Sequence, residues 1–375
     1  MKTPRLRVGI VGLQPGRSWA ARAHVPALRA LSEIYAIAGV ANTSPQSAEL
    51  AAAAIGLPRA FASVAELVTS PEVDLVAVTV KVPHHHEIVK AALRAGKHVY
   101  CEWPLANGLA EAEELAALAR ASGVVCVVGT QAVVAPEIEH VRRLIVDGFV
   151  GDVLSTSLVA RGGGWGGSIP SKRISAYLLD RANGATLLTI PVGHTLAALR
   201  TVLGDVAEVS AVLATRRTTA IAADTGETLP MSAPDQVLVS GLLVGGAPVS
   251  IHYCGGTARH GEGLVWEISG TDGEIRISGS LGHPQMVQLR VAGARADETA
   301  FRTLEIPSSL RDELALEVEA GNVARLYARM ARDVRDGTRT APTFDDAVAV
   351  HRVIAAIEHA ADTGTRTAPG PDPAA

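Results

Sequence analysis

Short apolar runs alternate with helical segments through the first third of the chain. The apolar runs show little alternation with polar residues, which is typical of strands buried on both faces of a sheet. They predict strands over residues 8–11, 35–41, 74–82, 98–101 and 124–129. Helical spacing predicts helices from residue 18 onward and over 47–55, 64–69, 83–95 and 109–122. This alternation indicates βαβ units, and therefore an α/β domain of the Rossmann type with a doubly wound parallel sheet.

Beyond about residue 135 the pattern changes to longer strands separated by glycine turns. Strands are predicted over residues 153–161, 206–214, 237–244, 248–253, 264–269 and 274–278, and helices over 137–147, 184–203, 323–336 and 344–363. Such a run of strands predicts an α+β domain with a large, open, mostly antiparallel sheet. We therefore expect a first domain over 1–134, a second over 135–363 whose last helices can pack on the first, and a flexible tail over 364–375.

The first domain brings several polar segments to one edge of its sheet. Right-handed crossovers place the carboxyl end of every parallel strand at the same edge, where doubly wound sheets bind their ligands. The segments that follow the predicted strands are Gly12 to Gly16, Asn42, Lys81 to His86, Glu102 to Pro104, and Thr130 with Gln131.

A glycine-bearing turn follows the first strand and reads Gly12-Leu13-Gln14-Pro15-Gly16-Arg17-Ser18, with Trp19 next. Ser18 is a suitable N-cap for the helix that follows. A strand, a glycine turn and a helix N-terminus together bind anions such as the pyrophosphate of a dinucleotide. The usual GxGxxG fingerprint has glycine where Gln14 stands, so an ordinary strand–turn–helix connection is the alternative interpretation.

The second predicted strand ends at Asn42, which is followed by Thr43 and Ser44. Domains that bind NAD usually carry Asp or Glu here, for the 2′-hydroxyl of the ribose. None of these three residues is negatively charged, so a 2′-phosphate would not be repelled. The segment therefore favours NADP weakly over NAD.

Composition and charge exclude several classes of protein. The 375 residues are 48% hydrophobic and 19% charged, which is typical of a globular chain, and the net charge of −4 argues against a direct nucleic-acid partner. The three cysteines, Cys101, Cys126 and Cys254, are isolated, which fits a reducing compartment and gives no metal motif. No secretory leader and no apolar run of membrane-spanning length is evident, so we expect a cytoplasmic protein without a membrane partner.

Tryptophan and histidine residues are the candidates for chemistry. Trp19, Trp103 and Trp165 lie in or beside loops, where their flat faces suit stacking on a nicotinamide or a sugar, although three unrelated loop anchors would look the same. His84 to His86 open a helix at the binding edge; consecutive side chains diverge, which disfavours a shared metal ion. His194 lies in an apolar helix and is either a silent core histidine or an acid–base group.

With these residues in view, the chain resembles the glucose–fructose oxidoreductase/inositol dehydrogenase (Gfo/Idh/MocA) family, and within it the Gal80-like branch. The resemblance runs from Arg5 to about Ala361. It rests on the segments Gly12 to His24, Val80 to Pro83, Glu102-Trp103, Gly163 to Trp165, Gly193 to Thr195, Pro248 to Ser250 with Gly255-Gly256, and His351-Arg352.

The resemblance implies a Rossmann domain that binds NAD(P) and a second domain whose open sheet lines the active site and carries an oligomer interface. A homodimer or homotetramer and a small carbohydrate-like substrate are the partners that it implies. Typical family enzymes use the lysine of a Glu-Lys-Pro motif together with an Asp and a His from one helix. Here Trp103 replaces the lysine, Ile190 and Thr189 stand where the Asp is expected, and His194 is retained. The bond between Trp103 and Pro104 is expected to be cis, as in the family.

Two functions therefore compete. The first, which we favour because the glycine turn, the binding edge and His194 are present, is NAD(P)-dependent oxidation or reduction of a sugar, polyol or glycoside by hydride transfer. The second is a non-catalytic, dinucleotide-binding regulator that acts on a protein partner.

The residue assignments follow from the favoured hypothesis. Catalysis is assigned to His194, assisted by Tyr177 or Lys81, and substrate binding to Trp103, Trp165 and His194. Cofactor binding is assigned to Gly12, Leu13, Gln14, Gly16, Arg17, Ser18, Trp19, Asn42, Val82, His84, His86, Glu102, Trp103, Pro104 and Gln131.

Overall fold

The computed structural model describes residues 4–259, 261–311 and 314–370, which form two compact units. The N-terminal unit comprises the chain up to Gln131 together with Leu314–Val348. The C-terminal unit comprises residues 132–313 and 349–375. The segment Leu314–Val348 thus belongs to the N-terminal unit, because its helix α9 (Val318–Asp336) packs on α1 and on the strand β5.

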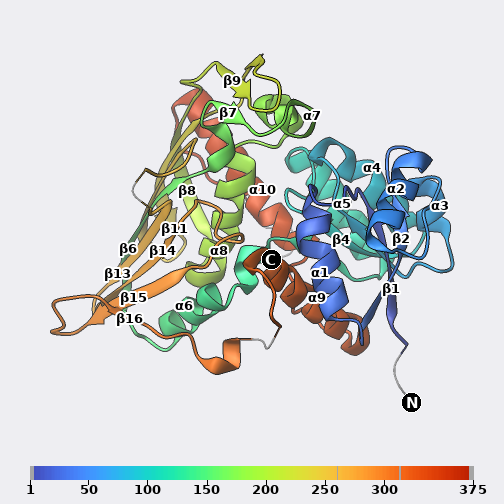
Figure 1. Ribbon diagram of the computed structural model, residues 1–375. Helices are drawn as coiled ribbons and strands as arrows, with labels where there is room; N and C mark the ends of the chain where they lie inside the picture. The colour runs from blue at the N-terminus through green and yellow to red at the C-terminus, as the bar shows by residue number, and fades with distance from the viewer. Residues whose placement is uncertain (1–3, 260, 312–313, 371–375) are drawn as a thin grey trace. The chain divides into compact units, whose positions relative to one another are not determined.

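The N-terminal unit is built on a five-stranded parallel sheet, which confirms the predicted doubly wound fold (Figure 1). The strand order is β2-β1-β3-β4-β5, so the order reverses between β1 and β3. The strands are β1 (Leu6–Val11), β2 (Tyr35–Ala41), β3 (Leu75–Val78), β4 (His98–Glu102) and β5 (Cys126–Gly129). Every residue of β3 and β5 is buried, as the apolar runs predict for strands covered on both faces.

Helices cover this sheet, and two of them begin at a serine cap. Ser44 and Ser63 accept backbone N–H groups at the starts of α2 and α3, and Gly56 ends α2 in the left-handed conformation. The helical elements are η1 (Ala20–His24), α1 (Val25–Ala30), α2 (Pro45–Ile55), α3 (Val64–Thr69), η2 (Val82–His84), α4 (His85–Arg94), α5 (Leu109–Ser122) and η3 (Gln131–Val134).

The C-terminal unit is built on an eight-stranded sheet of order β16-β15-β14-β13-β6-β12-β11-β8. All neighbouring strands are antiparallel except β6 and β12, which confirms the predicted open sheet. The strands are β6 (Val153–Arg161), β8 (Val206–Ala214), β11 (Gln236–Leu243), β12 (Pro248–Cys254), β13 (Leu264–Gly270), β14 (Gly273–Gly279), β15 (Arg290–Arg295) and β16 (Arg302–Thr303).

Helices α6 (Pro136–Val146) and α8 (Gly193–Leu203) lie along one face of this sheet (Figure 1). A small sheet of order β10-β9-β7 lies beside it in the same unit. The remaining elements are β7 (Ser168–Ile169), β9 (Thr219–Ala222), β10 (Thr228–Pro230), η4 (Gly163–Trp165), α7 (Lys172–Ser175), η5 (Ala176–Leu179), η6 (Arg181–Asn183), η7 (Leu188–Val192), η8 (Ser308–Leu310) and α10 (Phe344–Thr363).

Two expectations about the C-terminal unit need correction. The described part of the predicted flexible tail is held in place: Thr367 forms a two-hydrogen-bond bridge with Val209, and Arg366 pairs with Glu208 at 2.8 Å. Residues 371–375 of that tail lie outside the described residues. The stretch Arg181–Leu203 does reach membrane-spanning length and composition, but 78% of its apolar window is buried inside the protein, as in a core helix.

A buried carboxylate orders the turn that pairs with β5, the edge strand of the N-terminal sheet. Asp333, near the end of α9, accepts hydrogen bonds from Thr338 Oγ1 at 2.7 Å, Thr340 N at 2.8 Å and Ala341 N at 2.9 Å. This turn places the carbonyl of Pro342 3.0 Å from the N–H of Val128 in β5. Burial alone would raise the pKa of Asp333, but these hydrogen bonds outweigh it and hold the pKa below its ordinary value.

We expect Asp333→Asn to lower the free energy of unfolding by about 2 kcal/mol near neutral pH, because an amide cannot accept from all of these donors. Since the folded pKa of Asp333 is depressed, its stabilisation is complete above the unfolded pKa of about 3.9 and is lost as pH falls through the folded pKa. Urea unfolding of both proteins at several pH values measures the difference. A deficit that stays constant down to the acid limit would contradict this account.

Candidate functional site

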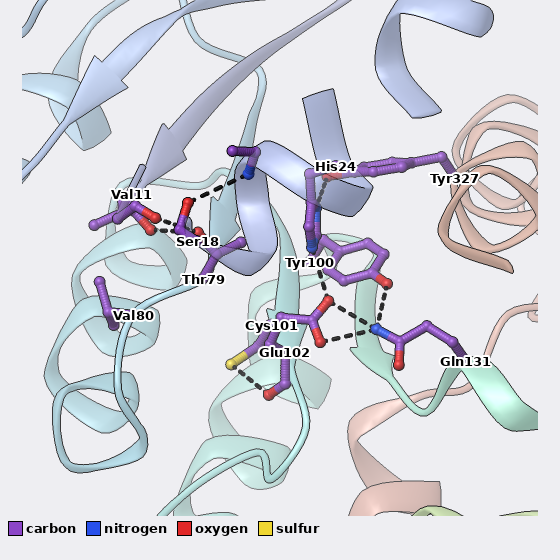
Figure 2. A network of polar contacts seen from close by, with 12 residues as sticks. Val11, Ser18, His24, Thr79, Val80, Tyr100, Cys101, Glu102, Gln131 and Tyr327 are labelled. Atoms are coloured by element: carbon purple, nitrogen blue, oxygen red, sulfur yellow. Dashed lines mark hydrogen bonds and ion pairs between the residues drawn. The ribbon is translucent and has the colours of Figure 1, made fainter. Parts of the chain in front are cut away.

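The turn after β1 passes very close to the end of β3, at the point where the strand order reverses. Gly12 has φ +98°, and a Cβ atom there would lie 2.6 Å from Val80 Cγ1. Thr79 Oγ1 donates to the carbonyls of Val11 at 2.9 Å and Gly12 at 3.0 Å, as Figure 2 shows. Position 12 therefore requires glycine for two independent reasons, backbone conformation and space.

Asn42 clasps this turn from the end of β2. Its Oδ1 accepts the N–H of Leu13 at 2.8 Å, and its Nδ2 donates to the carbonyls of Leu13 at 2.9 Å and Ser47 at 3.0 Å. Both ends of the Asn42 amide are thus engaged in holding the turn and the start of α2. The sequence interpretation assigned Asn42 to cofactor binding, and the structure gives it a positioning role in the turn.

Ser18 closes the other end of the turn. Its Oγ accepts the N–H groups of Gln14 at 2.9 Å and Ala21 at 3.3 Å, so it caps the first helical turn as predicted. Gly16 has φ +70° with no neighbouring atom near its missing Cβ, and the segment from Gln14 to Arg17 is exposed. Beside it, the buried Nε1 of Trp19 has no hydrogen-bond partner among the described residues.

These features fit a dinucleotide. A Rossmann fold holds pyrophosphate where a glycine turn meets a helix N-terminus at the switch point, and the chain has that turn in that place. The absence of space for a side chain at Gly12 and the unpaired Nε1–H of Trp19 are the two observations that support the fit.

A buried chain of polar groups lies behind the ends of β4 and β5. Glu102 accepts from His24 Nε2 at 2.8 Å and from Gln131 Nε2 at 2.8 Å, and His24 Nδ1 lies 2.8 Å from the hydroxyl of Tyr327 on α9 (Figure 2). With the carboxylate charged, Nε2 of His24 carries the proton and Nδ1 accepts from Tyr327. A Cβ at Gly129 would lie 2.8 Å from Oε2 of Glu102, so that glycine provides room for the carboxylate.

These hydrogen bonds turn the side chains of Glu102 and Gln131 toward the protein interior. Glu102 is 9% exposed and Gln131 is fully buried. The two residues, both assigned to cofactor binding from the sequence, therefore anchor the ends of β4 and β5 to His24 and α9, and they act on a ligand at this edge by fixing the backbone there.

The three consecutive histidines separate as their spacing predicts. His84 is exposed, whereas both ring nitrogens of His86 pair with carboxylates, Glu87 at 3.0 Å and Glu114 at 2.8 Å. His86 is thus bonded to α4 and α5 through both ring nitrogens, and its assignment to the cofactor stays a prediction. The buried member is His85, whose ring lies 2.8 Å from the carbonyl of Pro104.

His85 joins the two loops of the binding edge, because its Nε2 lies 3.0 Å from the carbonyl of Val80. Burial lowers its pKa. The peptide bond between Trp103 and Pro104 is cis, as the resemblance implies, and Trp103 is only 5% exposed. At this edge, the buried Trp103 therefore stands where typical family members have a lysine.

In the C-terminal unit the predicted substrate-binding residues are buried. Trp165 is 2% exposed and its Nε1 donates to the carbonyl of Leu178 at 2.9 Å, which fixes the indole within its loop; its assignment to substrate binding stays a prediction. His194 is 3% exposed. Burial, and then repulsion from His283 nearby, lowers the pKa of His194 to about 3.

The two assisting residues lie in different units. Tyr177 is half-buried in the C-terminal unit, and burial raises its pKa. Lys81 is exposed in the N-terminal unit. A neutral His194 can bind a hydroxyl group by hydrogen bonding, but near neutral pH it takes up no second proton and is a weak base.

Sequence reasoning missed several members of the site. His24 and Tyr327 are 303 positions apart, so no local pattern links them. His85 stands within a segment that the sequence placed at the binding edge, whereas Thr79 lay inside the predicted strand 74–82, where its hydroxyl was the available signal. His283 follows a glycine turn and carries no pattern that distinguishes it from a loop residue.

Two family models match the chain, and the ranges that they match adjoin near Gln131, where the N-terminal unit ends its first segment. Residues 6–130 match the family model described as the oxidoreductase family with an NAD-binding Rossmann fold. Residues 136–279 match the model of the Gal80p C-terminal domain.

Relatives of both kinds are similar over most of the chain. The chain is 32% identical to the dehydrogenase aclE of Aspergillus oryzae, covering 97% of this chain and 98% of that protein. It is 25% identical to levoglucosan dehydrogenase of Pseudarthrobacter phenanthrenivorans over 71% of this chain and 70% of that protein. The crystal structure of a super-repressor mutant of Saccharomyces cerevisiae Gal80p superposes with a TM-score of 0.87 at 25% identity, covering 97% of this chain and 98% of that one.

The match to a dehydrogenase over nearly the whole length, together with two family models in tandem, shows that the chain belongs to the Gfo/Idh/MocA oxidoreductase family, with a Gal80p-like C-terminal domain.

Proposed function

We propose that the protein is an NAD(P)-dependent oxidoreductase that transfers a hydride to or from a hydroxyl-bearing or carbonyl carbon of a sugar, polyol or glycoside. The observation that carries the proposal is the turn at Gly12, held by Asn42 and Thr79 at the switch point of a parallel sheet. Levoglucosan dehydrogenase, among the relatives, is a carbohydrate enzyme by name, which supports the substrate class.

The chain would bind the cofactor through its own backbone at the turn. Within the exposed segment from Gln14 to Arg17, the N–H of Gly16 would meet the pyrophosphate, and Trp19 offers Nε1–H, whereas the N–H groups of Gln14 and Arg17 already bond within the turn. Asn42, Thr43 and Ser44 bring no negative charge to the end of β2, which supports NADP weakly over NAD. When bound, the cofactor supplies the carbon that gives or takes the hydride.

His194 would bind the reacting hydroxyl as a neutral hydrogen-bonding group. Because burial lowers its pKa to about 3, the ring is neutral near neutral pH and is a weak acceptor for the substrate proton. Tyr177 and Lys81 remain the proposed assistants, and Trp103 and Trp165 the proposed apolar walls of the substrate site.

Self-association is a further part of the proposal. A row of side chains crosses the second face of the eight-stranded sheet in register, from Val212 through Leu238 and His252 to Val159. Val212 and Val159 are 59% and 53% exposed. This uncovered apolar row supports a homodimer or homotetramer. The three cysteines are free and buried, which supports a cytoplasmic location.

A Gal80-like regulator is the second candidate function. The match of residues 136–279 to the Gal80p C-terminal domain favours it, as does the presence of Trp103 where typical family enzymes carry their lysine. Such a protein would bind dinucleotide without turnover, and the bound dinucleotide would change its affinity for a protein partner.

We expect His194→Ala to lower kcat about a hundredfold while NADH affinity stays near the wild-type value, because His194 lies outside the N-terminal unit. Since its pKa is about 3, wild-type kcat/KM should show no ionisation of this histidine between about pH 6 and 8. Absorbance of the nicotinamide with levoglucosan, L-sorbose and a polyol panel measures turnover.

The matched control for this experiment is His359→Ala, which removes an exposed imidazole from α10. It should leave kcat unchanged. Full activity in His194→Ala would refute the role of His194. Saturable NADH binding without turnover of any panel member would favour the regulator instead.

We expect Asn42→Ala to weaken NADH binding about tenfold, because the variant loses the hydrogen bonds that fix Leu13 and must order the turn on binding. Quenching of tryptophan fluorescence during NADH titration measures the affinity. Asn183→Ala in the C-terminal unit is the control and should bind as wild type. Equal NADH affinity in Asn42→Ala and the wild-type protein would show that the hydrogen bonds of Asn42 do not contribute to cofactor binding.

A further inference from the structure

His283 lies in the loop between β14 and β15, against the end of β6. The N–H of Gly282 donates to the carbonyl of Arg161 at 2.8 Å, and Leu281 Cδ1 lies 3.7 Å from where a Cβ of Gly163 would be. The loop is thus fixed beside the glycine-rich segment 162–167. His283 itself is 9% exposed.

His194 approaches the same segment from the helical side. A Cβ at Gly162 would lie 2.2 Å from Leu187 Cδ1 and 3.3 Å from Pro191 Cγ. Pro191 precedes His194 by three positions, where η7 passes into α8. Gly162 is therefore the point at which the start of α8 and the loop of His283 come together, and all of these residues belong to the C-terminal unit.

Each of the two imidazoles carries an unpaired nitrogen. Nδ1 of His194 and Nδ1 of His283 are buried and have no hydrogen-bond partner among the described residues. An unpaired polar atom in a protein interior costs free energy, and buried polar groups are ordinarily satisfied. The two rings are near enough to interact electrostatically, and a ligand with polar hydrogens can pair with both atoms.

The state of the rings defines what kind of ligand fits. Burial lowers the pKa of His194 to about 3 and that of His283 to about 4, so both rings are neutral near pH 7. His283 also bonds to the backbone of Gly162. Because its Nδ1 has no partner, Nε2 makes that bond and carries the proton, which leaves Nδ1 as an acceptor.

A neutral acceptor suits a hydroxyl group and offers nothing to an anion. A carboxylate or phosphate would gain no charge pairing from two neutral, buried rings, which is unfavourable. An uncharged molecule with several hydroxyl groups meets both requirements of the site.

We propose that His194 and His283 form a paired binding site for an uncharged polyhydroxylated molecule, with Nδ1 of His283 accepting a hydrogen bond from a hydroxyl other than the one bound by His194. This deepens the proposed function, on which it rests for the identity of the molecule as the substrate. His283 is then a residue that determines specificity, because it selects for a second hydroxyl group.

Two variants of His283 separate ligand binding from the local fold. His283→Gln places an amide nitrogen near the position of Nε2, so it retains the bond to Gly162 and removes the acceptor. His283→Asn places an amide oxygen near the position of Nδ1, so it retains the acceptor and removes the bond to Gly162. Thermal unfolding of each variant shows whether its fold is retained.

The test is calorimetric binding, in the presence of NADH, of levoglucosan, L-sorbose, several polyols and the deoxy analogues of each ligand that binds. The wild-type protein should lose about three- to tenfold in affinity for one deoxy analogue relative to its parent. His283→Gln should bind the parent more weakly by the same factor and no longer distinguish it from that analogue. His283→Asn should still distinguish them.

Three results would overturn the proposal: no binding by any member of the panel, unchanged affinities in His283→Gln, or tighter binding of an anionic sugar acid than of its neutral parent. Because binding is measured rather than turnover, the two claims fail separately. Turnover that is insensitive to His283→Gln removes this site and leaves the oxidoreductase, whereas hydroxyl-selective binding without turnover removes the oxidoreductase and leaves the site.

Discussion

The approach of Gly12 to Val80 is the constraint on which the binding edge depends. It brings the ends of β1 and β3 together at the switch point, where no side chain could stand at position 12. Asn42 and Thr79 then fix the turn from both neighbouring strands. The turn is therefore folded in advance of any ligand, which reduces the ordering cost of binding.

Hydrogen bonds among buried residues fix the other loops of the binding edge. Glu102, His24 and Tyr327 link β4 to η1 and α9, and His85 links the loop after β3 to Pro104. The C-terminal unit contributes neutral buried imidazoles, at His194 and His283. Where the family resemblance implies a lysine, the N-terminal unit carries the buried Trp103.

Much of the fold was predictable because burial on both faces leaves an unmistakable apolar pattern in parallel strands. The turn at Gly12 and the polar segments at the binding edge followed from topology alone. Side-chain direction did not: Trp165 reads as a loop residue but is buried, and His86 turns toward Glu114. Pairs such as His24 with Tyr327 depend on tertiary packing between distant segments, which no local pattern records.

The most direct measurement is NADH titration of the wild-type protein and of two glycine variants, Gly12→Ala and Gly16→Ala. Both glycines have positive φ, but only the Cβ at position 12 meets another atom. The account predicts saturable binding by the wild-type protein, a loss of at least about tenfold in Gly12→Ala with the fold retained by circular dichroism, and a small effect in Gly16→Ala. Absence of wild-type binding, or equal affinity in Gly12→Ala, would contradict it.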